Sequence, residues 1–218
     1  MKINKIIPKA LKEIVLRKSK ESIIRSINLF NADKNEVSLT DKHLKNCKLL
    51  ESRIKLLNQI PSKGIVAELG VDNGEFSEKI LKYNKPKKLH LIDSWSNSRY
   101  NSQKEENVRR KFKENSNVII NKGLSTEVVS EFGSNYFDWI YIDTVHDYLT
   151  TREELSLYAP KVKNGGIIAG HDYTSGNWPS LVPYGVIEAV HEFCFKENWE
   201  LIFLTVENFP SFAIKKIN

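Results

Sequence analysis

The sequence has little cysteine and no long apolar run, and these two features argue against a disulfide-rich secreted protein and against a membrane-spanning one. The two cysteines, Cys47 and Cys194, are far apart and fit no metal-ligand spacing, so we interpret them as free thiols of a reducing compartment. No apolar run approaches the roughly 18 residues of a membrane span. The N-terminal segment MKINKIIPKALKEIVLRKSK lacks the continuous apolar core of a signal peptide. We therefore expect a cytoplasmic protein without stable membrane insertion.

The charge of the chain gives a weaker indication of its partners. The formal net charge is +6, with much of the excess before residue 60 and in residues 82–88. The basic residues are not interleaved with aromatic residues, as they often are on a nucleic-acid-binding surface. This pattern favours a Lys-rich solvated surface and predicts no nucleic-acid partner.

Residues 1–60 have apolar side chains spaced three and four apart, which predicts helices. One helix is expected over residues 41–60, with Thr40 or Asp41 as its N-cap and Pro61 as its stop. We interpret residues 1–60 as a helical extension of a larger domain, residues 61–218. The extension could serve as a lid, as the surface of a homo-oligomer, or as a membrane-surface helix. Its apolar faces are interrupted by charges, which favours the lid or the oligomer.

From Gly64 onward, strand and helix patterns alternate. Mostly apolar strands joined by helices predict an α/β fold, a mostly parallel seven-stranded sheet with helices on both faces. Only a short turn separates the last two strands, so they should form an antiparallel hairpin. In such sheets, ligands bind beyond the carboxyl ends of the strands. The expected strands are residues 64–70, 88–95, 117–123, 137–143, 165–173, 200–208 and 211–217.

The ends of the first two strands carry candidate binding residues. Gly70 and Gly74 permit a tight turn, but the third glycine of a dinucleotide fingerprint and the lysine of a P-loop are both missing. Glu68 is an acid inside a strand end, which favours a cationic or amine-bearing ligand. Asp93 follows the turn by roughly 20 residues, the offset at which an acid reaches ribose hydroxyls. The alternative for Asp93 is a cap on the following loop.

Four segments at the strand ends follow one another in the order ELGVDNGEFS, IDSW, IYIDTVHDY and GGIIAGHDY. Together they resemble class I S-adenosylmethionine-dependent methyltransferases. The resemblance extends from about Gly64 to the C-terminus, and is closest to the bacterial small-molecule branch that includes macrolide-sugar O-methyltransferases. It implies a Rossmann-like fold, in agreement with the strand pattern.

The resemblance implies S-adenosylmethionine as the cofactor and a position for each strand end. Gly70 and Gly74 would pass under its methionine part, and Asp143 would face the same part. Glu68 would lie near the ammonium group or in a backbone network. The enzyme would mainly have to align an acceptor with the activated methyl group.

The adenosine half of the cofactor is expected at the second and third strand ends. Asp93 would bind the ribose hydroxyls, and Ser94 and Trp95 would lie close to the adenosine. Ser125 would lie beside adenine. These roles are implied by the resemblance.

A divalent metal is one possible source of acceptor activation. Relatives that methylate sugar hydroxyls have an acid at the fourth strand end and two acids at the fifth, which hold an ion that is usually magnesium. Here the corresponding residues are Asp143, His171 and Asp172. Magnesium prefers oxygen ligands, whereas a histidine suits manganese, iron or zinc better. We therefore expect either a magnesium or manganese site at these three residues or no metal.

The metal-free alternative is general base catalysis by His146 or His171 near neutral pH. In the sugar enzymes the base is an acid two residues beyond the strand-end acid, and here that position is Val145. His146 is the next residue, and Asp143 could orient it; a purely structural His146 is the other reading. Asp147 is expected to cap the helix that begins near Thr150.

The expected activity is O-methylation of a small hydroxylated molecule, such as a sugar of a glycan or natural product. An N-methyltransferase or nucleic-acid methyltransferase is less favoured, because the fourth strand lacks an Asn/Asp-Pro-Pro-aromatic run. A non-catalytic module that binds S-adenosylmethionine is the third possibility. Tyr173, Trp178 and Tyr184 lie in the loop 173–184 and either line the acceptor pocket or pack the loop.

Overall fold

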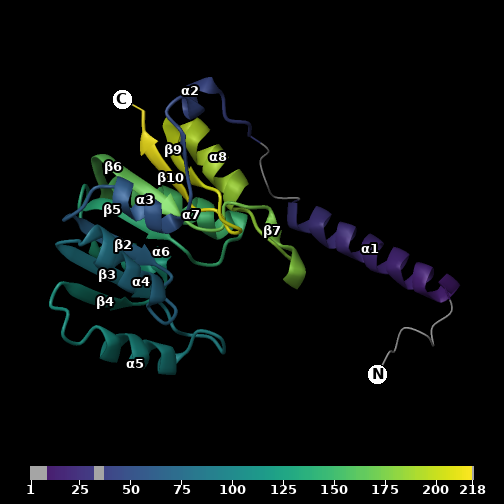
Figure 1. Ribbon diagram of the computed structural model, residues 1–218, viewed down its shortest axis with the longest axis horizontal. Helices are drawn as coiled ribbons and strands as arrows, with labels where there is room; N and C mark the ends of the chain where they lie inside the picture. Colours follow the sequence, from purple (N-terminus) through teal and green to yellow (C-terminus); the bar gives the residue numbers. More distant parts are fainter. Residues whose placement is uncertain (1–8, 32–36, 218) are drawn as a thin grey trace.

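The computed structural model describes residues 9–31 and 37–217, and its centre is one eight-stranded sheet with helices on both faces (Figure 1). The strands lie in the order β1-β9-β10-β6-β5-β2-β3-β4. They are β1 (Lys48–Leu50), β2 (Ile65–Leu69), β3 (Lys88–Asp93), β4 (Val118–Lys122), β5 (Phe137–Ile142), β6 (Val162–Gly170), β9 (Trp199–Thr205) and β10 (Phe212–Lys216).

The seven strands predicted from the sequence are all present. β2 to β6 are parallel, and β10 is antiparallel to both β6 and β9, so the predicted terminal hairpin is confirmed. The chain moves outward from β2 to β4 and then returns to place β5 on the other side of β2. This reversal opens a crevice beyond the carboxyl ends of β2 and β5, where ligands of such sheets bind.

Helices cover both faces of the sheet because the parallel strands are apolar on both sides. The helices are α3 (Arg53–Gln59), α4 (Glu75–Lys79) with a π turn (η2, Ile80–Asn84), α5 (Ser102–Lys111), α6 (Ser125–Val128), α7 (Tyr148–Tyr158) and α8 (Val186–Glu197). Ala67, Ile140 and Ile168 point into the layer beneath α6, α7 and α8. Val66 and Trp139 point into the opposite layer, beneath α3, α4 and α5.

The continuous helix expected over residues 41–60 is wrong. Its place is taken by a short helix α2 (Asp41–Leu44), strand β1 and helix α3. β1 pairs in parallel with β9 and adds an eighth strand at that edge. Backbone pairing there satisfies hydrogen-bonding groups that β9 would otherwise expose, which outweighs the local helical pattern. The stop at Pro61 is confirmed, because α3 ends at Gln59.

The N-terminal part contains one long helix, α1 (Lys9–Asn31), which stands apart from the sheet in Figure 1. The predicted helical pattern over residues 1–8 lies outside the described residues, and the division of the chain at residue 60 stays a prediction. A small hairpin, β7 (Gly176–Asn177) with β8 (Val182–Pro183), follows β6. Among the described residues, no helix is long and apolar enough to cross a bilayer.

Candidate functional site

The turn after β2 brings the backbone against the end of β5. Gly70 has a φ of +84°, and a Cβ there would lie 1.9 Å from the carbonyl oxygen of Asp143. Only glycine fits both the left-handed conformation and this close approach. Gly74, with a φ of +72°, forms the N-cap of α4. The left-handed backbone conformation at both positions therefore explains why the predicted tight turn contains these two glycines.

Asp93 holds this turn in place. Its Oδ2 accepts hydrogen bonds from the backbone N–H groups of Val71 and Asp72 at 2.8 and 3.0 Å, and its Oδ1 accepts one from Trp95 at 2.9 Å. A carboxylate offers about four acceptor positions, so one remains on Oδ1 for a ligand hydroxyl. Trp95 is buried and its indole donates to the Asp72 carbonyl at 3.0 Å, whereas Ser94 is half-buried beside it.

Glu68 lies beneath the turn and not at its surface. The side chain is buried and accepts a hydrogen bond from Ser77. Burial raises its pKa to about 8, and the Ser77 hydrogen bond only partly opposes that rise. The group is therefore largely uncharged at neutral pH, so it supports the turn and does not offer a negative charge to an ammonium group.

Ser125 is joined to the end of β5 through a buried acid. Glu154, on α7, accepts hydrogen bonds from the hydroxyls of Ser125 and Thr144 at 2.5 and 2.8 Å. Burial raises the pKa of Glu154 to about 7. Tyr158 donates to the Ser125 carbonyl at 2.9 Å. The loop after β4 is thereby fixed to the loop after β5.

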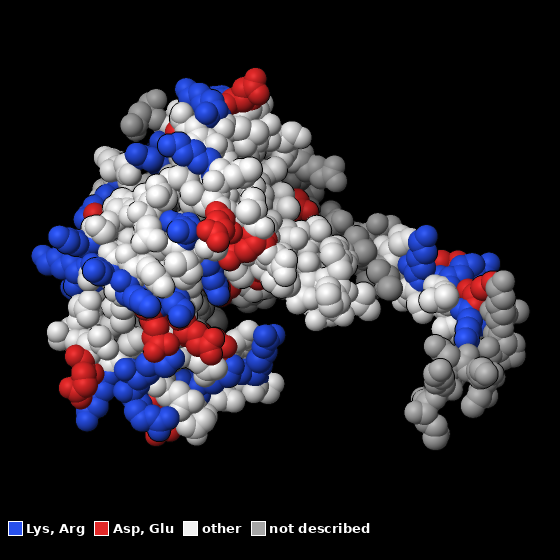
Figure 2. Space-filling view, viewed as in Figure 1, with Lys and Arg blue, Asp and Glu red and all other residues white. Residues whose placement is uncertain are grey.

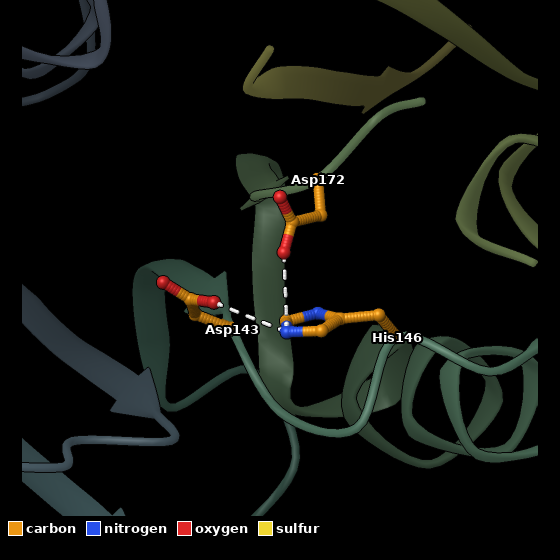
Figure 3. Close-up of side chains that lie close together, drawn as sticks. All are labelled: Asp143, His146 and Asp172. Carbon is orange, nitrogen blue, oxygen red and sulfur yellow. Dashed lines mark ion pairs between the residues drawn. The ribbon is translucent and has the colours of Figure 1, made fainter. Parts of the chain in front are cut away.

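The carboxyl ends of β5 and β6 bring two acids and a histidine together, and their polar atoms face one another (Figure 3). Nε2 of His146 lies 3.1 Å from Oδ2 of Asp172 and 3.9 Å from Oδ1 of Asp143. One ligand atom from each residue lies within 4.8 Å of the others. This cluster differs from the predicted metal ligands in containing His146 in place of His171.

His171 lies at the margin of the same cluster. Its Nδ1 is 3.3 Å from Oδ1 of Asp172 and 3.8 Å from Oδ1 of Asp143. Burial raises the pKa of Asp143, and His171 and His146 oppose that effect. For Asp172, burial also acts to raise the pKa, but the hydrogen bond from His171 and the charges of both histidines outweigh it and lower the pKa. All four predicted side chains are therefore brought together.

The backbone of the cluster is held in an uncommon conformation. His146 and Asp172 have φ values of +64° and +56°, in the left-handed region that costs most residues free energy. Gly185 donates its N–H to the His146 carbonyl at 2.8 Å, and the Tyr184 ring packs against the imidazole at 5.0 Å. Asp147 accepts from the Thr150 N–H at 2.8 Å as the N-cap of α7, so its predicted capping role is confirmed.

Arg53 is a site residue that the sequence analysis missed. It lies in the extension, at the start of α3, yet its Nη1 is 3.6 Å from Oδ2 of Asp143. Its guanidinium lies over the Phe76 ring at 4.5 Å, and the backbone N–H of Arg53 donates to Oε1 of Glu207 at 2.6 Å. Tyr141, Asp143 and Glu207 together raise its pKa despite its burial. No local motif marks this arginine, because the contact depends on the sheet that brings α3 beside β5.

The three aromatic residues of the loop after β6 lie in different surroundings. Tyr184 faces the cluster, whereas Trp178 is exposed on the short hairpin. The Tyr173 hydroxyl lies 2.5 Å from Nε2 of His191, and its ring packs against Phe212. Tyr173 is therefore used in ordinary packing, one of its two predicted roles.

Part of this chain is similar in sequence to a known protein family. Residues 67–173 match the model of a family described as a methyltransferase domain. The match covers slightly less than half of the chain. The matched segment contains the glycine turn, Asp93 and the Asp143–His146–Asp172 cluster. No curated protein that was searched matches the chain.

Solved structures share the fold of this chain. A putative methyltransferase of Streptococcus mutans, solved in complex with SAH, has 14% identity and a TM-score of 0.57, and the match covers 76% of this chain and 96% of that one. A putative caffeoyl-CoA O-methyltransferase of Staphylococcus aureus has 14% identity and a TM-score of 0.56, covering 94% and 97%. The N-methyltransferase NodS of Bradyrhizobium japonicum has 14% identity and a TM-score of 0.57, covering 76% and 93%. At these identities the likeness shows the Rossmann-like methyltransferase fold alone.

Proposed function

We propose that the protein is an S-adenosylmethionine-dependent methyltransferase that methylates a hydroxyl group of a small molecule, such as a sugar of a glycan or natural product. The observation that carries the proposal is the convergence of two elements at one edge of the sheet. The glycine turn fixed by Asp93 offers a place for a nucleoside, and the carboxylate–histidine cluster lies beside it, within the segment that matches the methyltransferase family model.

The cofactor-binding roles follow from the contacts of the turn. The free acceptor position on Oδ1 of Asp93 suits a ribose hydroxyl, and Ser94 and Trp95 flank it. Ser125 begins α6, after β4, where Glu154 holds its hydroxyl, and we assign it to the adenine end of the cofactor. S-adenosylmethionine supplies an activated methyl group when it is bound.

The ion pair between Arg53 and Asp143 is suited to bind the methionine end of the cofactor. An α-amino acid is a zwitterion, and the 3.6 Å separation between Nη1 and Oδ2 leaves each charge available to an opposite one. We assign the carboxylate of the methionine part to Arg53 and its ammonium group to Asp143. This pairing replaces Glu68, whose charge is suppressed by burial.

The donor set of the cluster fits a divalent ion. Asp143, His146 and Asp172 offer two carboxylate oxygens and one imidazole nitrogen that face a common point (Figure 3). Such a mixed set suits manganese better than magnesium, because magnesium prefers oxygen ligands. Asp143, His146 and Asp172 would hold such an ion, which would lower the pKa of a bound acceptor hydroxyl.

Without an ion, His146 would serve as the general base. Asp172 accepts from Nε2 in that case and fixes the orientation of the ring. The convergence of all three ligand atoms favours the metal over this alternative. His171 then acts on the charge of Asp172 from the margin of the cluster.

The cellular setting is proposed to be the cytoplasm, with a small-molecule acceptor and no nucleic-acid partner. The free thiols of Cys47 and Cys194 are compatible with a reducing compartment.

The test is methyl transfer from labelled S-adenosylmethionine to a panel of sugars and other hydroxylated compounds, beside amines and RNA. Transfer to a hydroxylated compound that is lost with EDTA and restored by manganese supports the proposal. Activity that survives EDTA but is lost in His146→Gln favours the base alternative. Transfer only to amines or RNA contradicts O-methylation, and cofactor binding without any transfer indicates a non-catalytic module.

A further inference from the structure

The net charge of the protein is concentrated in its N-terminal segment. Residues 1–31 contain eight Lys or Arg residues and two Asp or Glu residues, whereas residues 32–218 contain 25 of each. The whole formal net charge of +6 therefore lies before residue 32. On the face shown in Figure 2, basic and acidic side chains are interspersed over the α/β domain, in keeping with its neutrality.

Helix α1 in this segment exposes apolar side chains as well as cations. Leu11, Ile14 and Val15 share one face at helical spacing and are 50%, 45% and 54% exposed. Lys18 continues this face seven residues after Leu11, whereas Lys20 lies on the opposite side, and both are exposed. Figure 1 shows the helix projecting from the domain, so it does not cover the crevice at the ends of β2 and β5 as a lid would.

We propose that α1 binds the surface of an anionic lipid bilayer. A basic helix with an exposed apolar face lies in the plane of such a surface, with its apolar side chains among the acyl chains and its cations at the headgroups. Lys18, at the end of the apolar face, can extend its amine to the headgroups while its stem stays in the apolar layer. The helix is not apolar enough to cross the bilayer, so the association is peripheral and reversible.

The charge distribution favours an anionic bilayer over a second copy of this chain and over a nucleic acid as the partner of α1. A second copy of α1 would bring two equally cationic helices together, which like-charge repulsion opposes. A nucleic acid would neutralise the cations but would leave Leu11, Ile14 and Val15 in water. An anionic bilayer both neutralises the cations of the helix and removes its apolar side chains from water.

The test is co-sedimentation of the full chain with vesicles of phosphatidylcholine alone or with about one-third phosphatidylglycerol. We expect binding to the anionic vesicles only, weakened strongly by about 0.5 M salt because the charges are exposed. Lys18→Glu with Lys20→Glu should weaken binding by about 30-fold or more, since each cation near such a surface contributes about fivefold. Leu11→Gln should weaken it by about tenfold.

Matched controls are available in the domain. Lys79→Glu with Lys113→Glu makes the same charge change at exposed positions outside α1, and Leu44→Gln changes another exposed helical leucine. These controls should bind as the wild type does. No binding to anionic vesicles, or equal losses in controls and α1 variants, would overturn the proposal.

The alternative occupants are separated by two further readouts. Tight binding of single-stranded RNA without vesicle binding assigns α1 to nucleic acid, and a dimer that Leu11→Gln dissociates, again without vesicle binding, assigns it to a second copy. Either result overturns the proposal. Circular dichroism of each variant verifies that the helix and domain are intact.

Discussion

Single residues at the carboxyl edge of the sheet divide into those that hold loops and those that face the site. Asp93, Glu68 and Glu154 mostly hold loops, and Asp143, His146 and Asp172 face one another. The sequence marks the second group, because the strand ends place these residues at the same edge. It does not reveal how hydrogen bonds or burial change each charge, which depends on neighbours distant in the chain.

The role of Arg53 is testable by removing its charge. Arg53→Gln should weaken binding of S-adenosylhomocysteine by about ten- to hundredfold, because a charged hydrogen bond to the carboxylate is lost. Calorimetric titration measures this change. Arg109→Gln is the control, since Arg109 pairs with Glu105 on the surface of α5. Equal affinities of the two variants would show that Arg53 does not contact the cofactor.

Glu154 should make stability depend on pH. Its pKa is about 7 in the folded protein against an ordinary value of 4.5, so between these values the folded state holds a proton that the unfolded state has lost. The stabilisation from this group is therefore complete below about pH 4.5 and falls as pH rises to about 7, by about 3 kcal/mol at most.

Glu154→Gln should remove this part of the pH dependence, because an amide does not ionise. Denaturant unfolding at a series of pH values measures the difference from the wild type. Glu153→Gln changes the exposed neighbour on the same helix and should leave the slope unchanged. A Glu154→Gln slope identical to that of the wild type would contradict the raised pKa.

The elements of the α/β domain follow from the sequence more closely than those of the extension. Apolar runs bounded by Gly or Asp mark the first five of the seven predicted strands, a short turn with Pro210 marks the last two, and Asp147 marks the start of α7. β1 is only Lys48, Leu49 and Leu50, within a sequence of helical period. It is a strand because β9 offers an edge to pair with, and no local pattern contains that information.

Truncation tests the place of β1 in the fold. Removal of residues 1–36 should leave the melting temperature nearly unchanged, because β1, α2 and α3 remain. Removal of residues 1–52 should lower it by several degrees or more, since β9 loses its parallel partner and Glu200 loses its hydrogen bond from Asn46. Equal melting temperatures would instead support a division of the chain at residue 60.

At the scale of the whole molecule, the sheet order explains why distant segments form one site. The reversal between β4 and β5 opens a crevice that the turn after β2, the loop after β3 and the cluster after β5 and β6 all border. The strand–helix alternation predicts this edge, as do the four motifs. The contribution of α3 could not be predicted, because the extension carries none of those motifs.

The measurement that tests the central claim most directly is calorimetric titration of S-adenosylhomocysteine into the full chain. The account predicts one binding site per chain, weakened at least about tenfold in Asp93→Ala, which loses both the turn contacts and the ribose acceptor. Asp41→Asn, at an exposed position on α2, should bind as the wild type does. No binding by the folded wild type, or the same affinity in Asp93→Ala, would contradict the account.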